Sequence, residues 1–410
     1  MTETSSPDPL NVGIITAHLS FEERGGSNYS IHRLAAELTE RGHRVTVYTI
    51  NYEHDNHIPV SCPYQVEDNI IDNDTLVGGT AELLNQLSTC IRPHDIFHVY
   101  IPGIIPLVGL YRWRTDDETP IVATLNGYTT FCTNTAAMED GCLTNCTHSK
   151  KFSHARERGV ERLTKLPRMA FNDIAGPRLM NQLDEYFCLS PAVKDIHEGV
   201  GIDAELLSVI PNMIDPTFQS EPPTETDDVR ILYVGRLEDI KGISVLLEAV
   251  TQMSATDYRV DIVGDNLLEY GPNLETYREQ TRESGIDDHV VFHGWVEYQK
   301  LSEYYAAADL FVHPGLWPEP FGRTILEAMQ HELPVICSDV GGPPWISGTA
   351  GRSYPRNDAS ALAAILDELV GDAAQRQQLG ENIDHELERF STERVIEEIE
   401  QRDRSHITAE

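Results

Sequence analysis

Basic residues are scarce in this sequence. Its 410 residues include 31 Lys and Arg against 66 Asp and Glu, which gives a formal net charge of −35. A surface this acidic repels polyanions, so nucleic acid is a poor candidate partner. The acidic residues are spread along the chain, a distribution typical of proteins adapted to concentrated salt, in which self-repulsion is screened. We therefore expect a source with a salty cytoplasm, and a generic acidic protein is the alternative.

Apolar runs long enough to cross a bilayer are also missing. The longest, FHVYIPGIIPLVGLY, contains Pro102, Gly103 and Pro106 and is too short. The first residues, MTETSSPDP, lack the basic residues of a signal peptide. These features predict a cytoplasmic location, with a peripheral contact at the inner membrane face as an option raised by the basic segment described below.

Cysteine is rare, with seven residues in the chain. Three of them, Cys132, Cys142 and Cys146, lie close together, and three such thiolates could bind a structural zinc ion or an iron–sulfur cluster. The spacing C-x9-C-x3-C is not a standard zinc pattern, so one disulfide or three separate thiols are the alternatives. The other cysteines are scattered and are expected to be reduced and partly buried: Cys62, Cys90, Cys188 and Cys337.

The chain is long enough for two domains, and its alternating strand and helix patterns predict the α/β class with doubly wound sheets. We place an N-terminal domain at residues 1–210 and a C-terminal domain at 211–390. Residues 391–410 are assigned to a helix that returns to the first domain. Within it, the segment from Phe390 to Gln401 carries Val395, Ile396 and Ile399 at helical spacing.

The most informative segment is WPEPFGRTILEAMQ, in which Glu319 and Glu327 stand eight positions apart. A loop runs into an apolar-periodic helix, whose first backbone N–H groups, from Gly322 through Arg323 to Thr324, can bind phosphate. The two carboxylates flank this anion site and can accept hydrogen bonds from hydroxyls. A ligand with hydroxyls at both ends and a diphosphate between them is a nucleotide sugar.

A second segment, ILYVGRLEDIKG, supports the same ligand. Ile231 to Val234 reads as a buried parallel strand that ends at Gly235, and the loop that follows carries Arg236 and Lys241. Two cations at the carboxyl end of a strand can hold a diphosphate. Near the amino end, Gly25 and Gly26 lie in a β-loop-α-β unit, where glycine lets the backbone approach a ligand closely.

These motifs together resemble the family 4 retaining glycosyltransferases of the GT-B fold. The resemblance covers nearly the whole chain and includes IPNMID at 210–215, VVFHGWV at 290–296, EPFGRTILEAM and DVGG at 339–342. It implies two Rossmann-like domains that face a cleft and transfer of a sugar from a nucleoside-diphosphate sugar to an acceptor. It also implies a front-face mechanism that needs no metal.

The resemblance implies roles for particular residues. The positions expected to act on the leaving diphosphate and the donor sugar are Arg236, Lys241 and Glu319. Glu327 is expected to hold the ribose, and the strand end at Phe292 to face the base. Further donor contacts are assigned to Gly25, Gly26, Asn126, Gly235, Phe321, Gly322, Arg323 and Thr324.

Two positions depart from the family pattern. Asn126 follows the strand PIVATL, where relatives often have a His that contacts the transferred sugar, and Pro343-Pro344-Trp345 replaces a common acidic residue. These departures leave the donor sugar open. Two other functions also stay open: an epimerase or hydrolase of nucleotide sugars on the same fold, and a non-catalytic scaffold subunit that binds the donor.

The basic segment at residues 150–178 has eight Lys or Arg against three acidic residues. Basic and apolar residues alternate in it, so it could lie on an anionic membrane or bind the phosphates of a lipid-linked acceptor. The alternative is a helix that forms salt bridges with the acidic remainder of the protein. A polysaccharide precursor or a small molecule is an equally open acceptor.

Overall fold

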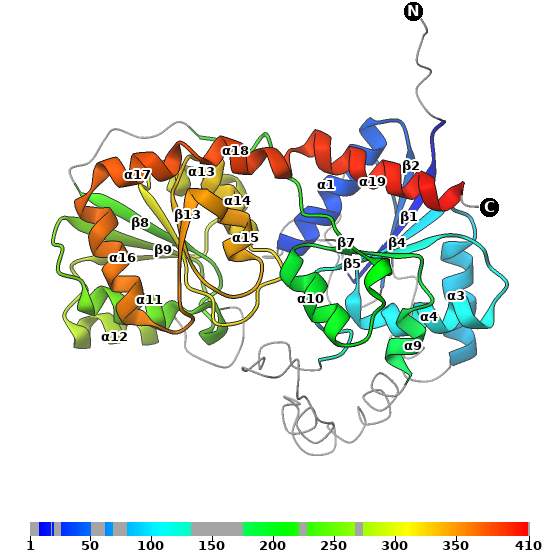
Figure 1. Ribbon diagram of the computed structural model, residues 1–410, viewed down its shortest axis with the longest axis horizontal. Coiled ribbons are helices and arrows are strands. Elements are labelled where there is room, and N and C mark those ends of the chain that lie inside the picture. The colour runs from blue at the N-terminus through cyan, green and yellow to red at the C-terminus, as the bar shows by residue number, and fades with distance from the viewer. Residues whose placement is uncertain are drawn as a thin grey trace, which may run out of the picture. The chain divides into compact units, whose positions relative to one another are not determined.

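The computed structural model describes residues 8–17, 19, 26–50, 62–68, 80–132, 175–220, 228–266 and 274–408. Several sequence predictions fall outside these ranges, namely Gly25, Cys142, Cys146 and residues 150–174 of the basic segment. The chain divides into two compact units, residues 1–213 with 395–410 and residues 214–394 (Figure 1). These limits lie close to the expected boundaries at 210 and 390.

The first unit is built on a parallel sheet with the strand order β3-β2-β1-β4-β5-β6-β7. Its central strands are buried on both faces, which explains why they read as continuous apolar runs rather than as alternating patterns. The strands are β1 Asn11–Thr16, β2 Arg44–Thr49, β3 Gln65–Glu67, β4 Ile96–Val99, β5 Ile121–Leu125, β6 Glu185–Cys188 and β7 Leu207–Val209.

Helices cover this sheet. The first, α1, buries the apolar face formed by Ile31, Leu34 and Leu38 and ends just before Gly42, whose φ of 94° suits glycine. The helices of the unit are α1 Gly26–Glu40, α3 Thr80–Ile91, α4 Ile105–Arg114, α9 Gly176–Met180, α10 Pro191–Gly199 and α19 Thr392–Ile407.

The expected C-terminal helix is present as α19, and its residues from Val395 onward belong to the first unit. Val395, Ile396 and Ile399 are buried in the core beside β1 and α1, as their spacing predicts. The apolar pattern stops there, but the helix continues to Ile407, within the range 391–410 assigned to it.

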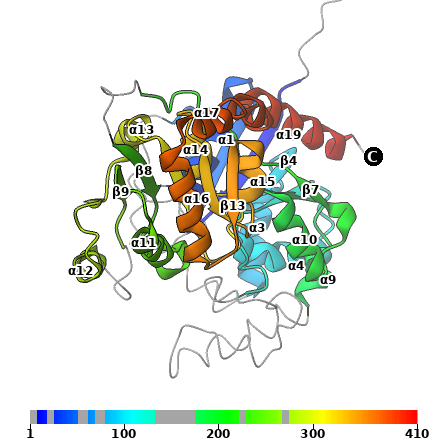
Figure 2. The ribbon, with the colours of Figure 1, turned by 60° about the vertical axis from the view of Figure 1, so that its left-hand side comes forward.

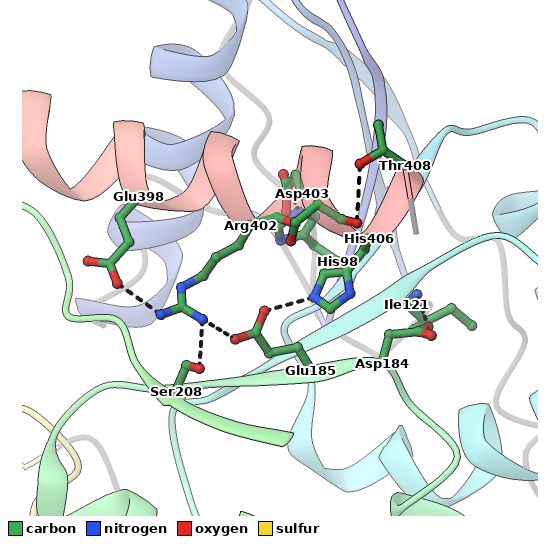
Figure 3. Close-up of polar contacts among 11 residues, drawn as sticks. His98, Ile121, Asp184, Glu185, Ser208, Glu398, Arg402, Asp403, His406 and Thr408 are labelled. Carbon is green, nitrogen blue, oxygen red and sulfur yellow. Dashed lines mark hydrogen bonds and ion pairs between the residues drawn. The ribbon is translucent and has the colours of Figure 1, made fainter. Parts of the chain in front are cut away.

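Polar contacts hold the last turns of α19 (Figure 3). The Arg402 guanidinium donates to Glu185 of β6 and, at 2.8 Å, to Ser208 of β7. His406 Nε2 lies 2.8 Å from the other Glu185 oxygen. Asp403 and His98 form a buried pair at 3.0 Å. These contacts lie beyond the apolar stripe, which is why hydrophobic periodicity does not reveal them.

The second unit contains a parallel sheet with the order β10-β9-β8-β11-β12-β13. Because parallel crossovers are right-handed, α11 and α12 lie on one face and α14 and α15 on the other, and α16 returns to pack along α11 (Figure 2). The strands are β8 Val229–Val234, β9 Tyr258–Val263, β10 Val290–Gly294, β11 Leu310–His313, β12 Val335–Ser338 and β13 Gly351–Tyr354. The helices are α11 Ile243–Gln252, α12 Leu274–Ser284, α13 Tyr298–Ala306, α14 Arg323–Met329, α15 Pro343–Ser347, α16 Ala359–Gly371, α17 Ala373–Gly380 and α18 Ile383–Leu387.

Both sheets are parallel and carry helices, so the predicted α/β class is confirmed. Among the described residues, no helix is both long and apolar enough to cross a membrane.

Candidate active site

The strand order of the second sheet fixes where a ligand can bind. The chain runs outward from β8 through β9 to β10 and then crosses back to β11 on the other side of β8. At such a reversal the loops after the two central strands diverge, and a crevice opens at their carboxyl ends. The loop after β8 carries Arg236 and Lys241, and the loop after β11 carries Glu319. Three predicted site residues therefore lie at the same reversal.

Lys241 and Glu319 join the two loops directly. Lys241 Nζ lies 2.5 Å from Glu319 Oε2, and both side chains are largely buried, with 15% and 17% exposed. The loops also touch through their backbones, since Leu316 N donates to Ile240 O at 2.8 Å. Gly242, at φ 74°, makes this approach possible, because a Cβ there would lie 1.7 Å from Pro314 O.

The DVGG motif supports Glu319 from the next strand. Gly342 N donates to the carbonyl of Glu319 at 2.8 Å. A Cβ on Gly341 would lie 2.5 Å from the same carbonyl oxygen, and its φ is 72°. Glycine is thus required for the loop after β12 to brace the backbone of Glu319.

The Glu319 carboxylate receives two donors on one oxygen, since Trp317 Nε1 also donates to Oε2, at 2.8 Å. Burial raises the pKa of Glu319, but the charge of Lys241 and the hydrogen bonds from Lys241 and Trp317 outweigh it, so the pKa lies below its usual value. His313 Nε2 is 4.0 Å from the same oxygen. Burial lowers the pKa of His313 to about 4, so its imidazole is neutral near pH 7.

Glu327 has a different environment. It is 4% exposed, accepts a hydrogen bond from Tyr305 at 2.9 Å and lies 3.3 Å from Arg323 Nε. Burial raises its pKa, and Arg323 and Tyr305 oppose that rise without cancelling it. The two glutamates of the motif therefore differ: Glu319 is held as an anion, and Glu327 is an acceptor whose charge is disfavoured.

Of the two predicted phosphate-binding cations, Lys241 contacts Glu319, whereas Arg236 pairs with a different carboxylate. Arg236 Nη1 lies 2.7 Å from Glu238 Oε1, and 42% of the Arg236 side chain is exposed. The helix after the EPFG motif begins at Arg323, with Gly322 at φ 97° as its N-cap and Thr324 in its first turn. With seven residues, α14 is short.

Other predicted donor contacts fall at the same edge or in the packing around it. Gly235 directly follows β8, and Phe292 lies in β10, where its carbonyl receives a long contact from Arg278 at 3.5 Å. Phe321 is 2% exposed and packs against Phe390. Its side chain belongs to the core, so only its backbone can contact a ligand.

The remaining predicted residues lie in the first unit. Gly26 is the exposed first residue of α1. Asn126 follows β5, and its Nδ2 donates to Tyr100 O, which follows β4, at 3.3 Å. Cys132 is the described member of the cysteine cluster, and the described residues contain no group of three or more metal-ligating side chains. The metal prediction concerns Cys142 and Cys146 as well, which lie outside the described residues.

Two residues of this site have no role in the sequence predictions, namely His313 and Trp317, although Trp317 is the first residue of the segment WPEPFGRTILEAMQ. Neither residue can be told from a structural residue by its sequence context, because His313 ends a buried strand and Trp317 stands in a Pro-rich loop. Their position two to six residues before Glu319, and after a buried parallel strand, is the signal that could have found them.

Comparison with known protein families agrees with this geometry. Residues 24–218 match the model described as Glycosyltransferase Family 4, and residues 215–386 match the model described as Glycosyl transferases group 1. The two matches follow one another along the chain and meet near the boundary between the two units. The chain belongs to the family 4-type glycosyltransferases.

Known relatives of this glycosyltransferase include proteins matched over part or most of their length. An uncharacterized 41.2 kDa protein in the cps region of Klebsiella pneumoniae is 26% identical over 198 residues, which cover 46% of this chain and 50% of that protein. The match thus spans about half of that relative. A D-inositol 3-phosphate glycosyltransferase of Nocardia farcinica is 25% identical over 91% of this chain and 84% of its own.

A solved structure shares the fold of this glycosyltransferase. Anabaena HepE in complex with UDP superposes with a TM-score of 0.75 at 19% identity, covering 96% of this chain and 100% of that chain. This similarity confirms the expected GT-B architecture.

Proposed function

We propose that this protein is a retaining glycosyltransferase that moves a sugar from a nucleoside-diphosphate sugar to an acceptor. The observation that carries the proposal is the Lys241–Glu319 pair at the reversal of the second sheet. It sets a cation suited to phosphate beside a carboxylate suited to sugar hydroxyls. HepE has been solved with UDP and with UDP-glucose, which supports a donor of the same chemical class here.

In the proposed reaction the bond between the anomeric carbon and the phosphate oxygen breaks, and a bond to the acceptor oxygen forms on the same face. The leaving diphosphate takes the acceptor's proton, so no protein nucleophile or metal is required. Catalysis then depends on stabilising the charge that develops on the leaving phosphate. Lys241 and the exposed Arg236 supply that stabilisation, and the first turn of α14 assists.

Glu319 and Glu327 bind opposite ends of the donor. Glu319, held as an anion, accepts hydrogen bonds from the sugar. Glu327 accepts from the ribose diol, and the end of β10 faces the base. Gly25, Gly26 and Asn126 are proposed as further donor contacts.

The acceptor is proposed to be a lipid-linked glycan, a polysaccharide precursor or a small molecule. In the first case residues 150–178 would be the segment that contacts an anionic membrane surface. A protein from a salty cytoplasm would rely on apolar side chains for much of that contact, because salt weakens the electrostatic part. A structural metal at Cys132, Cys142 and Cys146 remains a separate proposal.

A thermal-shift panel tests the donor assignment. UDP, GDP and ADP, each alone and as a sugar nucleotide, are added to wild-type protein and to Lys241→Ala. A ligand at a hundred times its dissociation constant adds roughly 2.7 kcal/mol to stability, so one nucleotide should raise the wild-type Tm clearly. No shift with any nucleotide, or equal shifts in the variant, would refute the site.

Product analysis separates the rival functions. Incubation of the bound sugar nucleotide without acceptor should leave it largely intact. Rapid release of free sugar would identify a hydrolase, and conversion to a different sugar nucleotide an epimerase. Tight donor binding without turnover on a broad panel of acceptors would instead favour a scaffold subunit.

A further inference from the structure

Glu319 stands on a tight turn that begins at Trp317. Glu319 N donates to Trp317 O at 2.7 Å, a three-residue turn with Pro318 at its centre, where the fixed φ of proline suits the conformation. The indole Nε1 donates to Glu319 Oε2 at 2.8 Å across the same turn. Backbone and side chain thus fix the carboxylate relative to Trp317.

The same oxygen also binds Lys241, whose ammonium lies 5.3 Å from the centre of the Trp317 ring. Both contacts use Oε2, and within the described residues no hydrogen bond to Oε1 is found. Oε1 is therefore the oxygen that remains for a hydroxyl of the donor sugar.

When a donor binds, its diphosphate and Glu319 compete for Lys241, and Trp317 remains as a partner of Glu319. A diphosphate at this edge attracts Lys241 and draws it away from Glu319. A carboxylate with only 17% of its side chain exposed would then lose its cation partner. The indole N–H is neutral and does not compete for phosphate, so it continues to hold Glu319 when Lys241 turns.

We propose that Trp317 positions Glu319 for the donor sugar and so sets the preference for a sugar nucleotide over the bare nucleoside diphosphate. This inference rests on the proposed function. It assigns Trp317 no contact with the reacting atoms, because it acts through Glu319.

The test compares Trp317→Phe with wild type, using calorimetric titration of UDP and UDP-glucose, GDP and GDP-mannose, and ADP and ADP-glucose. Phe keeps an aromatic ring and removes the N–H donor; the ring also becomes smaller, a change that Trp113→Phe makes as well. Affinity for the sugar nucleotide should fall on the order of tenfold, the effect of a lost hydrogen bond to a charged group, while the nucleoside diphosphate binds as before. The acid limb of sugar-nucleotide binding should also move to higher pH, because Glu319 loses a donor that keeps it ionised.

Two further variants make the result decisive. Trp113→Phe, at an indole that is 61% exposed in the first unit, should leave both affinities unchanged. In a Glu319→Gln background, Trp317→Phe should have little further effect, because the two residues act as one unit. Equal losses for nucleotide and sugar nucleotide, or additive losses in the double variant, would overturn the inference. If wild-type protein binds none of the six compounds, the proposed function itself fails.

Discussion

Replacing Tyr305 by Phe should weaken the second unit in a way that depends on pH. Tyr305 is fully buried, and its hydroxyl donates to the buried carboxylate of Glu327 at 2.9 Å. A hydrogen bond to a charged group contributes roughly 1.5–3 kcal/mol. For a domain of this size each kcal/mol changes Tm by roughly 2–4 °C, so the Tm should fall by roughly 3–12 °C.

The pH dependence follows from the direction of the Glu327 pKa. Burial raises this pKa in the folded protein, so folding favours the protonated carboxyl over the ionised one. The stability that the protonated form contributes is lost as pH rises through the folded pKa. Without the Tyr305 hydroxyl the ionised form has one donor fewer. The Tm difference between Tyr305→Phe and wild type should therefore be largest at neutral pH and shrink toward pH 5.

Tyr354→Phe is the matched control for this experiment. Tyr354 is 2% exposed, and its hydroxyl has no hydrogen-bond partner in the part of the chain that is described. Removal of an unpaired buried hydroxyl should be neutral or stabilising at every pH. Differential scanning calorimetry of both variants across pH 5–8 measures the contrast. Equal effects in the two variants, or a Tyr305 effect that grows on acidification, would refute the assigned hydrogen bond between Tyr305 and the ionised Glu327 carboxylate.

Three other outcomes are expected. Arg236→Ala should lower turnover on the order of a hundredfold with an unchanged Tm, because the charge proposed to stabilise the leaving phosphate is lost; steady-state kinetics checks this. His406→Gln should destabilise the protein below about pH 6.5 and hardly at pH 9. The hydrogen bond to Glu185 raises the His406 pKa, so protonated His406 stabilises the fold, and this stabilisation is lost as pH rises through the folded pKa. Thermal melts at both pH values decide it. Raising KCl from 0.1 to 2 M should increase Tm, because salt screens the formal charge of −35; a fall in Tm would count against salt adaptation.

The sequence predicts those candidate site residues that directly follow a recognisable strand or stand in a glycine-containing loop. Lys241 and Glu319 follow buried parallel strands, and strand order alone then brings their loops together. Gly242 and Gly341 are needed because each lies at positive φ against another loop, which leaves a signal in the sequence. These features could be predicted because backbone geometry restricts the residue types.

Side-chain pairing over long sequence distances could not be predicted. Arg402 and His406 bind Glu185, more than two hundred positions away, and no periodicity marks those partners. Trp317 was missed because an indole N–H leaves no pattern in composition or spacing, although it binds a residue two positions away.

The stereochemistry of transfer distinguishes a retaining glycosyltransferase from an inverting one. Proton NMR can follow the anomeric signal of the product formed from an α-linked sugar nucleotide, with membrane-lipid extract as acceptor and EDTA in the buffer. A metal-independent retaining enzyme should give a glycosidic product with α configuration, one nucleoside diphosphate released per sugar transferred, and a rate that EDTA does not change. A β-configured product, or activity that disappears with EDTA, would contradict the proposed mechanism.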